Sequence, residues 1–555
     1  MKKLTIASLI MTSSLLLSRI IGFVRDATIA SEFGSGVQTD AYFAAFQLPD
    51  FLSYLVAGGA FSLTFIPIFT AYLVKNEEDK GWKLYSIIIS IMTVVLVVAI
   101  IILEIFTPQI VKSMFPGFDK ETLDKTILFT RIVLPAQLFF YNGGIISAIL
   151  LSKKKFLIPA LAPLIYNISI ILFGLMFAKY GMIGYSIGAL VGAFIGPFGL
   201  QFWALRKEMK FKLNFNIMDK DFINFFKKSL PIMLGLILVT LDDWLSKRYG
   251  SFLDKGTISY LNNSRRLVLV PIGLFAQANA QAILPFLSEY FAQNSFKKFS
   301  ELARKSLTLV FFITAFASSW YIVFHNEIIR MVYQRGAYTV QDTILTSEVF
   351  LMFSLSIPFW ASIVIISRFY YAIHNTRTPM IIGGLMSLLS LPLYGYLSNL
   401  YKVQGLALTV SIIKVLYFLM LLVFYKKYNK NFELVPIIKD LSKIILFFTL
   451  LTYLFYLVKT DVITVLLFGV EKATSILPYI KMSSSIKERV DLIIAFIIIS
   501  SLQLVITLFL AKYIKVDAYN EFKVKYLNRI LRKLRLAWYR YEIYYVLEWL
   551  IEKET

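Results

Sequence analysis

The chain has 555 residues, of which 58% are hydrophobic and 16% are charged, whereas soluble proteins carry about 25% charged residues. With a mean hydropathy of +0.70, this composition excludes a soluble globular protein and predicts an all-α polytopic membrane protein. The absence of cysteine excludes disulfides, thiolate metal sites and cysteine nucleophiles, and two histidines, His325 and His374, are too few for a histidine-based metal cluster. The net charge of +23 favours cytoplasmic loops that face anionic lipid over a nucleic-acid partner.

The apolar segments predict about fourteen membrane-spanning helices, since such a helix needs about 20 mostly apolar residues. In chain order they lie at residues 5–33, 38–74, 84–107, 126–151, 157–178, 182–205, 229–250, 257–291, 306–325, 345–373, 379–399, 403–425, 437–458 and 490–513. The second and eighth are long and interrupted by glycine and proline, as is common where helices line a transport path. The first is too long for a signal-peptide core, so we expect a retained helix.

The connections between these segments alternate in positive charge. The richer set holds about 35 lysine and arginine residues and the other set about 15, and the positive-inside rule makes the richer set cytoplasmic. It comprises Lys2 and Lys3, residues 75–83, 153–155, 206–228, 297–305 and 426–443, and the C-terminal tail. Both termini are therefore expected in the cytoplasm, in agreement with an even number of helices.

The chain also repeats itself with an offset of about 220 residues, which corresponds to six helices. Four landmarks keep this offset in the same order: Tyr42 with Tyr260, Pro67 with Pro285, Tyr72 with Tyr290, and Pro135 with Pro358. The repeat predicts two pseudo-symmetric six-helix lobes, residues 1–215 and 216–430, around a central cavity. Residues 431–513 add two transmembrane helices, and the basic, aromatic tail at 514–555 is typical of an amphipathic helix on the cytoplasmic face.

The first segment carries three ionisable residues at bilayer depth, Arg19, Arg25 and Asp26. Each costs about 2.5–3.5 kcal/mol there on insertion scales, so such residues face a protein interior or a watery cavity. Two arginines favour an anionic ligand. Arg19 and Arg25 point about 120° apart on a helix, and they reach one cavity only if Gly22 loosens it; Ser18 shares the face of Arg25. The alternative is that Arg25 and Asp26 pair with neighbouring helices and only fix their packing.

Arg265 and Arg266, in the eighth segment, add positive charge to the second lobe alone. Arginine binds phosphate oxygens in bidentate geometry and keeps its charge, so a cavity lined by these arginines and those of the first segment is expected to attract phosphate. The alternative is that both residues lie near a membrane face and snorkel.

Asp242 and Asp243 lie near the outer end of the seventh segment. Carboxylates suit hard cations, so the pair is a candidate site for a cation or proton that drives transport. The alternative is that they pair with the nearby Lys247 and Arg248.

The residues of the first 70 positions carry a family resemblance. The run SRIIGFVRDATIASEFG, followed by TDAYFAAFQLPDFL, AGGAFS and FIPIF, resembles the MurJ/MviN family of lipid II flippases in the multidrug/oligosaccharidyl-lipid/polysaccharide exporter superfamily. The segments RRLVLVPIGLF and FYYAIHNTRTP are similar to that family too, and the likeness covers residues 1–430. The resemblance implies two six-helix lobes in a V-like arrangement plus two C-terminal helices.

The resemblance also implies which residues matter. Its motifs match at five positions that the family needs: Arg19, Arg25, Asp26, Asp40 and Arg266. One departure concerns the motif after Pro49, where many members carry a basic residue and this chain has Ser53 and Tyr54. In addition, an AGGA stretch replaces an acidic EGA form. The cavity is then less basic, with Arg265 or another residue compensating, or the cargo differs.

The function implied is transport of the undecaprenyl-diphosphate-linked peptidoglycan precursor, lipid II, from the inner to the outer leaflet of a bacterial plasma membrane. No P-loop is present and no cofactor is expected, so the energy comes from a monovalent cation gradient, the membrane potential or downstream consumption. Expected partners are lipid II, anionic phospholipid at the cytoplasmic face and proteins of cell-wall synthesis, without nucleic acid.

Four other functions stay open beside this one. Two share the fold: an exporter of another polyprenyl-linked polysaccharide unit, and a cation-coupled multidrug exporter. A glycosyltransferase would need a catalytic carboxylate cluster in an extramembrane loop, which the short basic loops do not offer, so we do not expect an enzyme. A structural scaffold for wall assembly would keep its function when the cavity arginines are neutralised.

Overall fold

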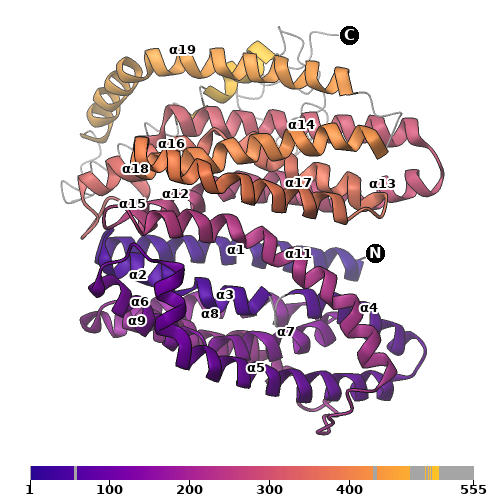
Figure 1. Ribbon diagram of the computed structural model, residues 1–555. Helices are drawn as coiled ribbons and strands as arrows, with labels where there is room; N and C mark the ends of the chain where they lie inside the picture. The colour runs from indigo at the N-terminus through magenta and orange to yellow at the C-terminus, as the bar shows by residue number, and fades with distance from the viewer. Residues whose placement is uncertain are drawn as a thin grey trace. The chain divides into compact units, whose positions relative to one another are not determined.

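The computed structural model describes residues 2–54, 59–428 and 434–475, together with residues 494, 498, 500, 501 and 503–511. All regular structure in these ranges is helical (Figure 1). Contacts divide the chain into two compact units that alternate along the sequence. We call them unit 1 (residues 1–263, 333–346 and 387–406) and unit 2 (residues 264–332, 347–386 and 407–555).

This grouping does not test the internal symmetry on which the predicted lobe boundaries at 215 and 430 rest, so these boundaries stay a prediction. The tail at 514–555 lies outside the described residues, and so does most of the last predicted helix at 490–513.

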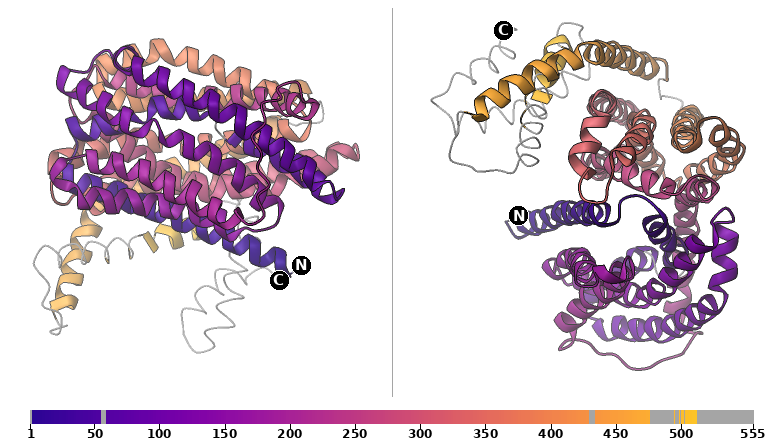
Figure 2. Two further views of the ribbon diagram at one scale, coloured as in Figure 1. Left: turned by 90° about the horizontal axis from the view of Figure 1, so that it is seen from below. Right: turned by 90° about the vertical axis from the view of Figure 1, so that its left-hand side faces the viewer.

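Unit 1 begins with a long helix and continues as a bundle whose helices run roughly alongside one another (Figures 1 and 2). Its helices are α1 (Lys2–Phe33), α2 (Val37–Ala45), α3 (Gln47–Leu52), α4 (Gly59–Val74), α5 (Glu78–Met114), α6 (Lys120–Val133), α7 (Ala136–Ser152), α8 (Leu157–Met176), α9 (Ile183–Ala193), α10 (Gln201–Leu205), α11 (Lys220–Gly250) and the start of α12 (Thr257–Pro271). Phe46 interrupts the predicted segment at 38–74 between α2 and α3, and residues 55–58, before α4, lie outside the described residues.

Local chemistry explains several of the helix boundaries in unit 1. Asp119 precedes α6 and accepts a hydrogen bond from the backbone N–H of Thr122 (3.0 Å), which satisfies one of the donors that a helix start leaves open. Asp219 caps α11 in the same way. Pro135 separates α6 from α7, because its ring has no N–H to continue the ladder. Together α6 and α7 still form one apolar stretch of 33 residues.

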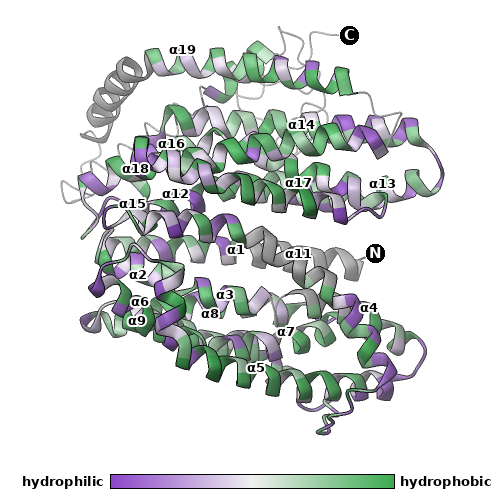
Figure 3. Ribbon diagram, viewed as in Figure 1, coloured by the Kyte–Doolittle hydropathy of each residue, from purple (hydrophilic) through white to green (hydrophobic). Residues whose placement is uncertain are grey.

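One face of α5 is apolar and exposed, while the opposite face is packed. The exposed side chains include Val94, Val98, Ile101, Ile102 and Ile105, and α5 is coloured as hydrophobic along most of its length (Figure 3). Inside unit 1 the core is aromatic: the ring of Phe61 stacks on that of Phe225 at 5.3 Å and meets that of Tyr141 edge-on at 6.0 Å. An apolar outer face around such a core is what a membrane-embedded bundle requires.

Unit 2 is built around α14 (Phe296–Val323). Its other helices are the end of α12, α13 (Ala278–Ala292), nearly all of α15 (His325–Tyr333), the second part of α16 (Val340–Ser354), α17 (Ile357–Ala372), parts of α18 (Arg377–Tyr428) and α19 (Leu434–Ser475). α13, α17 and α19 pack on α14. Arg304 at the start of α14 pairs with Asp440 of α19 (2.8 Å), and Thr452 of α19 donates to Ser319 (2.7 Å), so polar contacts fasten α19 at two levels.

α18 contains the two predicted segments at 379–399 and 403–425. It is broken at Lys402, whose backbone has φ 48° and ψ −129°. The turn is tight, since a Cβ at Gly405 would lie 1.9 Å from the carbonyl oxygen of Leu397. Only glycine fits this close approach of the backbone.

Among the described residues, seven helices are long and apolar enough to cross a membrane, or eight if α16 and α17, which meet at 44°, form one span. The chain is therefore an all-helical, multi-pass membrane protein.

Candidate functional site

Arg25 and Asp26 of α1 form a cluster with α8. Arg25 donates from Nε and Nη2 to Oδ1 of Asp26, at 2.9 and 2.7 Å, and from Nη1 to Oδ1 of Asn167 at 3.0 Å. Asn167 donates in turn to the carbonyl of Pro163 (3.0 Å), one turn earlier in α8. The Asp26 side chain is fully buried and that of Arg25 is 11% exposed. A carboxylate and an amide thus hold Arg25 in one orientation, and Asp26 balances its charge.

Arg19 is placed differently from Arg25. α1 runs through Gly22 without a break, so the two arginines keep their separation of about 120° around the helix axis. Arg19 is exposed and Ser18 is half-buried. Gly22 therefore does not loosen the helix. It lies next to Asn167, whose Oδ1 would be in ordinary van der Waals contact, at 3.6 Å, with a Cβ at this position.

Asp40, in α2, binds the start of α12. Its Oδ1 accepts from the backbone N–H and the hydroxyl of Ser259, at 2.8 and 2.7 Å, and its Oδ2 accepts from the backbone N–H of Gly256 at 2.6 Å. The first N–H groups of a helix have no partner within the helix and carry partial positive charge. The buried carboxylate of Asp40 therefore caps α12 from another helix, and its predicted contact with substrate stays a prediction.

Asp242 and Asp243 have separate partners. Oδ1 of the buried Asp242 accepts from the hydroxyl of Tyr394 at 3.2 Å. Oδ2 of Asp243 pairs with Lys247, one helical turn later (2.9 Å), and accepts from Gln47 of α3 (2.7 Å). The structure thus contains the pairing with Lys247 that the sequence offered as an alternative. No group of three or more acidic or histidine side chains suited to a metal ion occurs among the described residues.

A second basic cluster lies in unit 2. The guanidinium of Arg265 is 5.3 Å from the ring centre of Trp360, and the ammonium of Lys414 is 4.7 Å from it. Cations over an indole face gain about 0.5–2 kcal/mol each, depending on how far they are desolvated. Arg265 and Lys414 are half-buried, whereas Arg266 is exposed. Two cations thus share one aromatic ring within predicted spanning segments.

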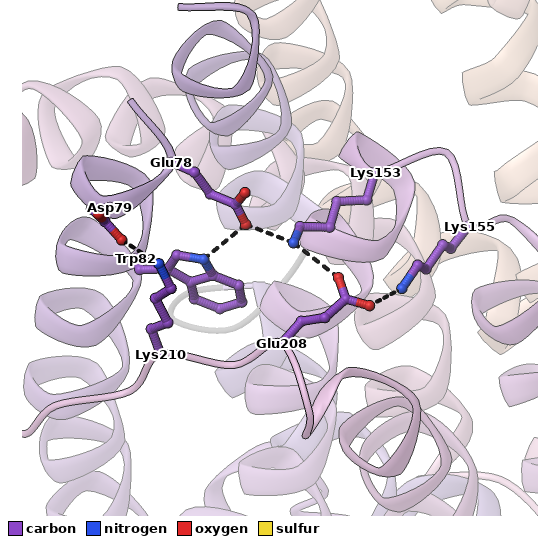
Figure 4. A network of polar contacts seen from close by, with 7 residues as sticks. All are labelled: Glu78, Asp79, Trp82, Lys153, Lys155, Glu208 and Lys210. Atoms are coloured by element: carbon purple, nitrogen blue, oxygen red, sulfur yellow. Dashed lines mark hydrogen bonds and ion pairs between the residues drawn. The ribbon is translucent and has the colours of Figure 1, made fainter. Parts of the chain in front are cut away.

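A third polar network lies at the loops of unit 1 and joins α5, the loop after α7 and the loop after α10 (Figure 4). Lys153 pairs with Glu78 at 2.6 Å and with Glu208 at 3.0 Å, Lys155 also pairs with Glu208, and Lys210 pairs with Asp79 at 2.6 Å. Hydrogen bonds from Lys155 and Lys153 lower the pKa of Glu208 below its usual range. The network neutralises several lysines of one predicted cytoplasmic surface.

Two residues of these clusters were missed from the sequence. Asn167 is neutral and 142 residues from Arg25, so nothing in the local pattern linked them. Lys414 gave a usable signal that was overlooked, because a single lysine in the middle of the apolar segment at 403–425 is as costly as Arg25 in the first.

Comparisons with known proteins agree with this architecture. The family model described as "Lipid II flippase MurJ" matches residues 29–477. The lipid II flippase MurJ of Thermosipho africanus is 32% identical over 454 residues, which cover 81% of this chain and 90% of that protein.

Two solved structures are similar as well. A lipid II flippase MurJ in an inward closed conformation matches with a TM-score of 0.70 and 28% identity, over 89% of this chain and 98% of that one. An inward-facing multidrug resistance transporter of the MATE family matches with a TM-score of 0.61 over 76% of this chain and 96% of that one; at 12% identity it shows the fold alone.

Proposed function

The chain belongs to the lipid II flippase MurJ family, and on that premise we propose that it carries lipid II from the inner to the outer leaflet of a bacterial plasma membrane. The family is one of transporters and not of enzymes. The observation that supports the proposal most directly is Arg25, an arginine held in one orientation inside a helical bundle and still partly exposed. A diphosphate is a ligand that such a guanidinium binds in bidentate geometry.

We propose that phosphate binds Arg25 beside Asp26. Oδ1 of Asp26 accepts two N–H groups of Arg25, and Asn167 accepts a third. A guanidinium has five N–H groups, so the two that remain, on Nη1 and Nη2, can donate to phosphate oxygens while the buried Asp26 keeps its partner. Arg19 in unit 1, and Arg265, Arg266 and Lys414 in unit 2, supply further positive charge. The lipid tail stays in the bilayer while the head group passes through protein.

We propose a finer architecture for this transport: fourteen spanning helices, two six-helix lobes and two additional helices, with both termini in the cytoplasm. Support comes from the helices α1 to α19, which follow the predicted segments in order, and from the similar fold of the MATE transporter. Parallel repeats of this kind act by alternating access. Coupling to a cation at Asp242 and Asp243, or to the membrane potential, belongs to the same proposal.

Complementation tests the proposal. A bacterium depleted of its own lipid II flippase is supplied with the wild-type chain or with Arg19→Ala, Arg25→Ala, Arg25→Lys or Arg266→Ala, and outer-leaflet lipid II is assayed at equal membrane levels. We expect rescue by wild type, loss with Arg25→Ala and only partial rescue with Arg25→Lys, because lysine keeps the charge but not the bidentate geometry. Rescue by every variant would contradict the role of the arginines, and failure of well-expressed wild type would contradict lipid II as cargo.

A further inference from the structure

A cavity of about 520 Å³ lies between α4 and α11 in unit 1. Thr64, Pro67, Ile68, Ala71 and Tyr72 of α4 line it, together with Lys75 just after α4 and Lys228 of α11. We call it the α4–α11 pocket. Its volume is in the range of about 300–1,000 Å³ that is typical of sites for small molecules. None of its residues belongs to the proposed substrate site.

The polarity of the pocket changes along its length. Lys75 follows the last residue of α4, and Thr64 lies eleven residues earlier, or about 16 Å deeper along the helix. Lys228 directly precedes the apolar segment predicted at 229–250, so both lysines mark the same end of their spans. One end of the pocket is therefore basic, and its deeper wall is mostly apolar.

The surface around the pocket is apolar as well. Val74 is 78% exposed, and Phe226 and Leu230 of α11 are 37% and 43% exposed. Pro67 and Ala71 are exposed within the pocket itself. Apolar side chains exposed beside a row of lysines are typical of the boundary between the acyl chains and the head groups of a bilayer.

The lysines of the pocket differ from those of the loop network in Figure 4. Lys153, Lys155 and Lys210 each pair with a carboxylate of unit 1. Neither Lys75 nor Lys228 forms an ion pair with another described residue.

Two acidic residues lie near the pocket, Glu77 after α4 and Asp221 in the first turn of α11. Glu77 pairs with Lys80 at 2.8 Å and also interacts electrostatically with Lys75. Because neither Lys75 nor Lys228 is held in a direct ion pair within the described part of the chain, the ammonium groups of both lysines keep N–H donors for a phosphate.

We propose that the α4–α11 pocket binds an anionic phospholipid of the bilayer. Its phosphate lies between the ammonium groups of Lys75 and Lys228, and its glycerol and upper acyl chain lie along Pro67, Ile68 and Ala71. Lysines near a membrane surface attract anionic lipid, and their stems pack on apolar groups while the charges stay in the head-group layer. The lipid joins α4 to α11, two helices that pack on each other, so anionic lipid content acts on their packing.

Native mass spectrometry of the full chain in detergent tests this proposal. Phosphatidylglycerol or phosphatidylcholine with the same acyl chains is added to wild type, Lys75→Gln/Lys228→Gln and Ala71→Trp. Lys297→Gln/Lys298→Gln is the matched control, because it removes two exposed lysines from the same predicted membrane face. We expect wild type and the control to retain phosphatidylglycerol over phosphatidylcholine. The Lys75/Lys228 variant should bind phosphatidylglycerol on the order of tenfold more weakly.

Ala71→Trp tests the contribution of the cavity apart from that of the charge, because the indole fills the cavity while both lysines remain. It should also lose bound phosphatidylglycerol. Equal binding by wild type and the Lys75/Lys228 variant, or equal retention of the two lipids by wild type, would overturn the proposal. Displacement of the lipid by millimolar inorganic phosphate would assign the lysines to a free anion instead. The readout is binding and not transport, so its outcome is independent of the complementation test.

Discussion

Arg25 in α1 and Lys153 in the loop after α7 both form short ion pairs, but their surroundings differ. Arg25 pairs with the adjacent Asp26, whose side chain is fully buried, and with a single amide of α8. Lys153 pairs with Glu78 and Glu208, which are each 39% exposed, and its neighbour Lys155 shares Glu208. The first cluster is buried, whereas the second can rearrange and is solvated. Ion pairs of similar length should therefore contribute very different free energies to the stability of the fold.

The largest effect should follow loss of the buried carboxylate. Asp26→Asn keeps the shape of the side chain but leaves Arg25 without its counter-charge, and breaking a buried pair costs about 3–5 kcal/mol. We expect a large fall in the apparent melting temperature of the purified protein. The double variant Arg25→Met/Asp26→Leu should recover most of that stability and still fail to transport. If Asp26→Asn lowered the melting temperature as little as Lys153→Gln in the loop network, the two clusters would not differ in their contribution to stability.

A smaller effect should follow loss of the amide partner. Asn167→Leu removes a hydrogen bond to a charged group, which contributes about 1.5–3 kcal/mol. Asn142→Leu is a matched control, because Asn142 also donates to the carbonyl four residues earlier, but its side-chain oxygen accepts from the neutral Thr93. In thermal unfolding, the fall in melting temperature should be about twice as large for Asn167→Leu as for Asn142→Leu. Equal losses would mean that the charge of Arg25 adds nothing to this contact.

The loop network should tolerate change. Lys153→Gln removes two partly exposed ion pairs, and exposed pairs contribute about 0.2–1 kcal/mol and are screened by salt. The difference in melting temperature between this variant and wild type should shrink from 50 mM to 1 M NaCl, while that of Asp26→Asn should persist. A fall in the melting temperature of Lys153→Gln that does not depend on salt would mean that the ion pairs of Lys153 behave like the buried pair of Arg25 and Asp26.

The smallest effect concerns Asp119 at the start of α6. Hydrogen bonds from Thr122 and the pairing with Lys255 lower its pKa to about 2. Its folded pKa lies below the unfolded value of about 3.9, so its contribution to stability is present above pH 4 and is lost as the pH falls toward 2. The group is 45% exposed, and we expect only a few tenths of a kcal/mol.

Asp119→Asn keeps the cap and removes the charge. The gap in melting temperature between wild type and Asp119→Asn should narrow from pH 5 to pH 2.5. A difference in melting temperature that widens over this range would show that the ionised carboxylate of Asp119 does not stabilise the folded state.

Hydropathy located long helices, and the glycine and proline pattern indicated that the segment at 38–74 is interrupted. The predicted segments at 84–107 and 157–178 correspond to α5 and α8, because a long apolar run in a membrane satisfies its backbone hydrogen bonds as a helix. The exact position of the break between α2 and α3, at Phe46, depends on how each short helix packs, and neither hydropathy nor composition encodes packing.

For the candidate site, the sequence predicted the charged residues but not their partners. Arg25 and Asp26 stand out because charge within an apolar run is costly. Their partner Asn167, and the contacts of Asp40 with Gly256 and Ser259, join residues far apart in the sequence. Such pairs follow from the tertiary fold, which a single sequence does not reveal.

The central place of α14 has a consequence for biosynthesis. In its most apolar stretch 83% of the residues are buried, and α19, which supplies one partner of Ser319, begins 111 residues after α14 ends (434 − 323). At about 5–20 residues per second, a ribosome needs roughly 5–20 s to reach it. Thr308 and Thr314 can donate to carbonyls of their own helix during that time. Ser319 receives its hydrogen bond from Thr452 only after α19 has been synthesised. Insertion of α14 into the membrane and completion of its polar contacts are therefore separate events in the synthesis of the chain.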